Sequence, residues 1–272
     1  MGHVLAILFA IALLTSAMLL TSQAYGKNTD NVNSHQPPIR KYQVYLEPSS
    51  FEYSNLNSSL AGALAFWEKS DNVSFRYVSE SQAPSFTVRG IMESDGPYSA
   101  YTINGREIEV GLGDSRCGGV WHEYDSKFVL SLLEHEVGHA IGHGHSRNPS
   151  SVMYPFVSNA SYKPLNQTLT VKPNKSIVVT ACTFSTNPSF HYKVSSSKGD
   201  LFDVYFVKSD TQPRNMMAEN AAYHSETGCH EIRPESHEGI CKNADSNSAL
   251  IIVPRSELST SMTVSAFVEE IH

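Results

Sequence analysis

The stretch "HEVGHAIGHGHS", residues 135–146, places four histidines and one glutamate within twelve positions. Imidazole nitrogens are preferred zinc ligands, and a nearby carboxylate can move protons beside the metal. Three histidines and one glutamate are enough for a catalytic zinc site, so one of the four histidines is in excess. The residues around this stretch indicate which three of the four histidines come together, and in which fold.

The segment "YDSKFVLSLLEHEVGHAIG", residues 124–142, is predicted to be a helix that carries the first two histidines. Asp125 or Ser126 can cap its first turn, and Gly142 is a suitable C-terminal stop. Apolar residues at helical spacing form one side: Phe128, Val129, Leu132, Leu133, Val137, Ala140 and Ile141.

His135 and His139 are four residues apart, so their side chains leave the same helix face one turn apart and can share one ion. On a straight helix His143 would lie about 12 Å along the axis from His135, too far to join them. A third histidine can return only if the helix ends, and Gly142 allows that end. Geometry alone leaves the third ligand open between His143 and His145.

The pattern H-E-x-x-H-x-x-G-x-x-H fits this stretch, with Gly142 and His145 at its last two defined places. The segment "SSVMYP", residues 150–155, puts Met153 eight residues past His145, where a methionine-containing turn is expected. Together, residues 135–155 resemble the matrixin branch of the metzincins, including Ser146 after the last histidine. The alternative, a helix with surface histidines, requires neither the glycine nor the methionine.

The resemblance implies a zinc metalloendopeptidase that acts on protein or peptide substrates. His135, His139 and His145 would bind one catalytic Zn²⁺, and Gly142 and Met153 would support the site. Glu136 would be the general base, taking a proton from the water that zinc activates and passing it to the leaving amine. His143 receives no catalytic part.

The upstream sequence predicts an α+β catalytic domain over residues 39–162, with a mixed twisted sheet and the active-site helix. Strands are expected at residues 39–46, 73–78, 85–91 and 107–113, and a helix at 54–70. This order is similar to that of a matrixin domain. An extended substrate is expected to pair with an edge strand near 107–113.

The chain departs from the family pattern in several places. Residues 86–121 contain no histidine, so no structural zinc is predicted, whereas a Ca²⁺ site stays open at acidic residues of this region: Asp95, Glu107, Glu109 and Asp114. The segment "FVSNASYKPLNQTL", residues 156–169, does not predict the third helix of the family. The C-terminal β part is a candidate to cover the surface that such a helix would bury. The resemblance places the S1′ wall, beside the residue after the scissile bond, in the loop after Pro155.

Beyond about residue 165 the composition shifts to short β-type runs separated by Asn, Pro, Gly and Ser. Runs of this kind predict an all-β, sandwich-like accessory domain over residues 166–272.

Four cysteines suit an exported protein with disulfides. Cys229 and Cys241 are expected to pair and close a hairpin-like loop, because "CHEIRPESHEGIC", residues 229–241, fits no common zinc module. Cys117 and Cys182 form the remaining pair, although four cysteines allow three pairings. The sequence "SRCGG", residues 115–119, faintly resembles the latency switch of the family, but its place inside the domain favours a structural cysteine.

Residues 1–24 are predicted to be a signal peptide cleaved after Ala24, or else an uncleaved N-terminal anchor, and 25–38 a flexible lead-in. Either places the rest of the chain outside the cytoplasm, secreted or at the cell surface, with a membrane contact only through that anchor. Five Asn-x-Ser/Thr triplets permit glycosylation there: those at Asn57, Asn72, Asn159, Asn166 and Asn174.

The net charge of −7 argues against nucleic acid as a partner, because phosphate contacts need a basic surface. A second hypothesis is an extracellular binding or adhesion protein with a vestigial protease domain. The intact set of three histidines and Glu136 weighs against it.

Overall fold

The computed structural model describes residues 38–48, 55–93, 99–157, 160–207, 225–246, 248–255 and 259–271. The expected signal or anchor at residues 1–24, and all but the last residue of the lead-in, lie outside these ranges. Within them, no helix is both long and apolar enough to cross a membrane.

The first part of the chain forms a five-stranded mixed sheet in the order β2-β1-β3-β5-β4. Its strands are β1 (Arg40–Leu46), β2 (Val73–Tyr77), β3 (Phe86–Ile91), β4 (Ala100–Ile103) and β5 (Glu107–Gly111). β1 pairs in parallel with β2 and β3, β3 pairs in parallel with β5, and only β4 runs antiparallel to its neighbour.

Strand β4 was not expected, and its position corrects the expected substrate edge. β5 lies between β3 and β4, so the segment near 107–113 is not an edge, and β4 is the last strand among the described residues. A tight turn joins β4 to β5: the Arg106 N–H donates to the Ile103 carbonyl (2.9 Å), and Asn104 and Gly105 both have positive φ. Asn-Gly favours this turn conformation, so the dipeptide was a usable hairpin signal.

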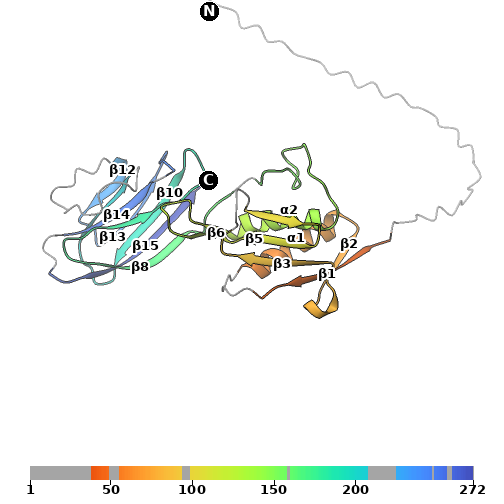
Figure 1. Ribbon diagram of the computed structural model, residues 1–272. Helices are drawn as coiled ribbons and strands as arrows, with labels where there is room; N and C mark the ends of the chain where they lie inside the picture. Colours follow the sequence, from red (N-terminus) through yellow and green to blue (C-terminus); the bar gives the residue numbers. More distant parts are fainter. Residues whose placement is uncertain are drawn as a thin grey trace, which may run out of the picture. The chain divides into compact units, whose positions relative to one another are not determined.

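Two helices pack together against this sheet (Figure 1). α1 (Leu56–Ser70) buries Leu60, Leu64 and Trp67, and α2 (Ser126–Ala140) buries the apolar side expected from its spacing. Asp125 is the N-cap of α2, accepting a hydrogen bond from the Lys127 N–H at 2.8 Å. The α+β architecture with a mixed sheet is therefore confirmed.

Two short strands and one turn of 3-10 helix complete this part. β6 (Gly113–Asp114) pairs with β7 (His122–Glu123) just before α2, and the 3-10 helix covers Glu80–Gln82.

The C-terminal part contains two four-stranded antiparallel sheets, in the orders β13-β10-β15-β8 and β12-β11-β14-β9 (Figure 1). Their strands are β8 (Leu165–Val171), β9 (Ile177–Thr180), β10 (Ser189–Ser196), β11 (Phe202–Val207), β12 (Ser225–Ile232), β13 (Ser236–Cys241), β14 (Ala249–Pro254) and β15 (Met262–Ile271). Side chains from both sheets, such as Phe190 and Tyr192 from β10 and Phe206 from β11, meet in one buried cluster.

The prediction that residues 229–241 form a hairpin-like loop is wrong. Cys229 and Cys241 do form a disulfide, but Cys229 lies on β12 and Cys241 on β13, and these strands belong to different sheets. The bond therefore links the two sheets, and both cysteines are buried.

Asp114 is the centre of a buried polar network next to α2. Its carboxylate is 4% exposed and accepts hydrogen bonds from the hydroxyls of Tyr162 (2.7 Å) and Tyr124 (3.0 Å). Its other partner is the Arg116 guanidinium. Burial by itself would raise the pKa of Asp114, but the hydrogen bonds from these partners outweigh it and hold that pKa below its ordinary value.

Asp114→Asn is expected to lower the free energy of unfolding at neutral pH by about 2 kcal/mol, the scale of hydrogen bonds to a buried charge. Because the folded-state pKa lies below the ordinary value of 3.8, this stabilisation is fully present above that value. It is lost as the pH falls through the lower, folded-state pKa. Urea unfolding of wild type and variant at neutral pH, near pH 5 and near pH 3 measures the difference.

Asp245→Asn, an exposed aspartate, is the control and is expected to change stability little at any pH. If the free energies of unfolding of wild type and Asp114→Asn differed as much near pH 3 as at neutral pH, that result would contradict the role of the ionised carboxylate.

Candidate metal centre

Three imidazoles converge where α2 ends. His139 Nε2 lies 3.1 Å from His135 Nε2 and 3.2 Å from His145 Nε2. Nitrogens bound to a tetrahedral zinc at about 2.0–2.1 Å would be about 3.3 Å apart. The three residues also form a group whose ligand atoms all lie within 4.8 Å of one another. Their spacing therefore fits a zinc ion.

Backbone carbonyls orient two of these rings. His135 Nδ1 lies 2.8 Å from the Val152 carbonyl, and His139 Nδ1 lies 2.8 Å from the His143 carbonyl. A carbonyl only accepts, so each Nδ1 carries the proton and each Nε2 offers its lone pair to the shared point. Burial lowers the pKa of His135, which favours the neutral ring that a metal requires.

The third imidazole returns because the helix stops. Ala140 is the last residue of α2, Ile141 is the C-cap and Gly142 has a φ of +101°. Such a φ suits glycine and not a residue with a side chain. The chain turns there, and His145 approaches the face that carries His135 and His139.

His143 faces away from this group. Its Nε2 lies 3.0 Å from Asp71 Oδ2, and its ring stacks on Trp67 with centroids 4.7 Å apart. Asp71 is in turn paired with Arg40 at 2.6 Å. His143 therefore holds the turn against α1 and β1 with its side chain, while its carbonyl orients His139.

Met153 packs against α2 at Gly138, the residue before His139. Its side chain is buried, and a Cβ placed on Gly138 would collide with its sulfur and with the Trp67 ring. The turn that carries Met153 is closed by a hydrogen bond from the Tyr154 N–H to the Ser151 carbonyl, 2.9 Å long. The expected methionine turn is thus the reason for a glycine at 138, a requirement that the sequence analysis did not identify.

Glu136 lies on the same face, 6% exposed, with burial raising the pKa of its carboxyl. The Thr102 hydroxyl donates to Glu136 Oε2 at 2.5 Å and so fixes one carboxylate oxygen. Thr102 lies on β4, the strand that the sequence analysis missed, and so this contact was missed as well. Glu136 and the three histidines line one cavity.

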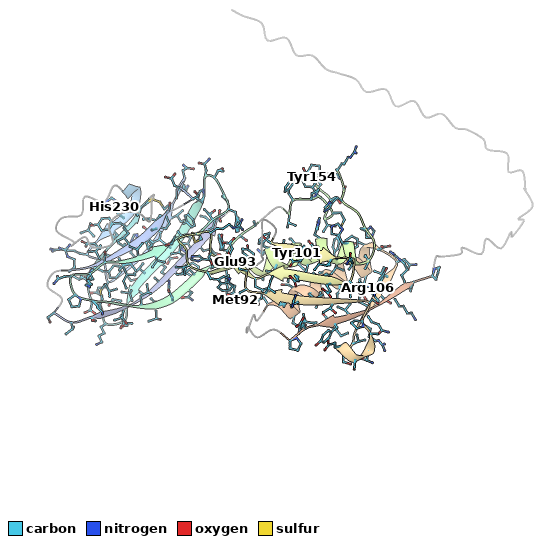
Figure 2. The ribbon with its side chains drawn as sticks, in the orientation of Figure 1. Met92, Glu93, Tyr101, Arg106, Tyr154 and His230 are labelled. Carbon is cyan, nitrogen blue, oxygen red and sulfur yellow. A yellow bond between two sulfur atoms is a disulfide. The ribbon has the colours of Figure 1, made fainter. Side chains whose placement is uncertain are left out.

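A cavity of about 550 Å³ opens beside these groups. It is lined by the three histidines and Glu136, by residues of β4 including Tyr101, and by Pro155–Val157. Tyr154 lies on the loop outside the sheet (Figure 2), in contact with Phe156 at 6.0 Å between ring centroids. Tyr154 is half-buried there.

Several of the other candidate ligands have partners of their own. Cys117 and Cys182 form a disulfide, as do Cys229 and Cys241, which are the two pairings expected. Among the acidic residues left open for Ca²⁺, Glu109 is bound by Arg89 and Tyr101, and Asp114 by the network above. Asp95 lies outside the described residues.

Comparison with known proteins agrees with this geometry over part of the chain. Residues 100–173 match the family model described as Matrixin. The match spans β4, α2, the three histidines and Met153, and supports a matrixin-like catalytic domain in this region. No curated protein matches the chain.

His145→Ala and His143→Ala are expected to separate the ligand from the supporting histidine. Removing His145 should leave two imidazoles and abolish stoichiometric zinc binding. Removing the His143 ring leaves its carbonyl in place, so zinc should still bind. The affinity should fall at most about tenfold, which is the smaller end of the range of losses seen when a residue that contacts a metal ligand is changed. Metal content after dialysis and competition with a chelator measure both.

Loss of zinc from His143→Ala alone would contradict the assignment. Circular dichroism of each variant without metal is the control for folding.

Proposed function

We propose that the chain is an exported, zinc-dependent endopeptidase of matrixin type. The observation that carries this proposal is the convergence of three imidazole Nε2 atoms beside the buried Glu136 carboxylate in one open cavity. The matrixin match over residues 100–173 supports the same class.

His135, His139 and His145 would hold the ion. Zinc bound there would supply Lewis-acid chemistry, polarising the scissile carbonyl and acidifying water. The Nδ1 contacts to the carbonyls of Val152 and His143 keep two of the rings in the orientation and tautomer that binding needs.

Glu136 is the proposed general base. Its carboxylate takes a proton from the attacking water and gives it to the leaving amine, which needs a pKa raised toward neutrality. Burial acts on Glu136 in this direction, and the Thr102 hydroxyl fixes one oxygen so that the other is presented to the reacting water.

The proposed substrate is an extended polypeptide that pairs with β4. This strand pairs only with β5 among the described residues, so its other edge offers backbone donors and acceptors to an added strand. Residues Ala100 to Thr102 line the cavity together with Glu136, which supports this mode of binding.

The organisation of the chain is part of the proposal. We place the catalytic domain at 39–162 and an accessory β-sandwich at 166–272, after a signal peptide or anchor at 1–24. The shared core of the two antiparallel sheets supports the sandwich, and two disulfides suit an oxidising compartment.

Glu136→Ala is expected to reduce kcat/KM on a cleaved peptide by about 10²–10⁴-fold, the usual contribution of a general base. Zinc content should stay stoichiometric, because Glu136 is not one of the three ligands. Glu134→Ala is the matched control on the same helix, two residues away and outside the cavity lining, and should retain activity.

Treatment with a chelator should remove activity, and added Zn²⁺ should restore it. If the wild-type protein binds zinc but cleaves nothing in a broad peptide library, the proposal is wrong.

A further inference from the structure

We propose that Phe184, a residue of the C-terminal β part, forms a wall of the substrate cavity and limits the size of the side chain accepted beside the scissile bond. This inference rests on the proposed peptidase function. It assigns a specificity residue outside the loop after Pro155, and outside the region that matches the matrixin model.

Phe184 lies between β9 and β10 but packs on the core of the first part. Its ring stacks on Tyr162, with centroids 4.5 Å apart and planes at 17°, and approaches Phe128 of α2 at 5.9 Å. It lines the same cavity as Glu136 and the three histidines. A side chain far along the chain thus reaches the candidate active site.

The backbone just before Phe184 is restrained by two contacts. Two residues earlier, Cys182 is bonded to Cys117, with Cα atoms 5.7 Å apart. The Thr183 hydroxyl donates to Glu270 of β15 at 2.7 Å. These contacts fix the segment to both parts of the chain, so the ring is a stationary wall.

Arg116 adds a third restraint. Its guanidinium carbon lies 5.2 Å from the centroid of the Phe184 ring, and the same group pairs with the buried Asp114. The positive charge of Arg116 at this end of the cavity is therefore balanced by the Asp114 carboxylate and by the face of the Phe184 ring. The cavity beside Phe184 suits an apolar side chain better than a carboxylate.

Phe184 also separates two spaces. A second cavity, of about 630 Å³, is lined by Lys127 and Ser131 of α2, and it shares Val157, Ala160 and Phe184 with the first. Truncating the ring would enlarge the space in both cavities. The wild-type chain should therefore accept apolar side chains of medium size, such as leucine, beside the scissile bond. It should reject side chains that are too long to fit between the scissile bond and the Phe184 ring.

The test is cleavage of a peptide series in which each residue flanking the scissile bond is varied in turn among Ala, Leu, Phe, Trp and biphenylalanine. Full-length, zinc-loaded wild type is compared with Phe184→Ala and Phe184→Trp. At one of the flanking positions, Phe184→Ala is expected to raise the kcat/KM ratio of biphenylalanine to leucine by about tenfold or more, and Phe184→Trp to lower it. Phe267→Ala, a half-buried phenylalanine on β15 away from both cavities, is the matched control and should leave the ratio unchanged.

Zinc content and melting temperature verify that each variant is folded, and Phe184→Leu replaces Phe184→Ala if the latter does not fold. An unchanged ratio in both the smaller and the larger variant, with the wild type active, overturns the inference and leaves the peptidase proposal intact. If the wild type cleaves no peptide of the series, the peptidase proposal fails, and the inference fails with it.

Discussion

The site depends on one geometric constraint: three imidazole nitrogens must meet within little more than 3 Å, although a continuous helix can supply only two of them. The constraint is met by ending α2 between the second and third ligand. Gly142, at a φ of +101°, turns the chain so that His145 returns, while His143, one helical turn beyond His139, leaves the group. His143, which continues the four-residue spacing of His135 and His139, is therefore the histidine that does not join the group.

Two backbone carbonyls orient the rings, one just past the end of α2 and one in the turn that carries Met153. The carbonyl of His143 meets His139 Nδ1, and the carbonyl of Val152, one residue before Met153, meets His135 Nδ1. The turn that carries Met153 packs on α2 at Gly138, where no side chain fits. Helix end, methionine turn and imidazole orientation are thus one coupled arrangement.

Features set by local periodicity could be predicted from the sequence, whereas features set by pairing between distant segments could not. Helix α2 and its ligand face were expected, because a spacing of three and four residues is visible in the letters. Strand β4 is only four residues long, and without it β5 was taken for an edge and Thr102 was not placed beside Glu136. The positive φ at Asn104 and Gly105 shows that the Asn-Gly dipeptide carried the missing signal. In the segment 229–241, the disulfide was expected, but nothing local indicates that Cys229 and Cys241 belong to different sheets.

The contact that sequence reasoning had least means to predict is the one between Phe184 and the first core. The segment after the methionine turn carries Tyr162, whose hydroxyl donates to Asp114 and whose ring stacks on Phe184. The C-terminal β part thus supplies apolar surface to Tyr162 and Phe128, in a chain whose sequence does not predict the third helix of the matrixin pattern. This surface is also a wall of the cavity beside Glu136, so the same ring covers the core and shapes the cavity. A change in the C-terminal part that moves Phe184 would alter both the packing on α2 and the shape of the cavity, so this part of the chain is not separable from the candidate metal centre.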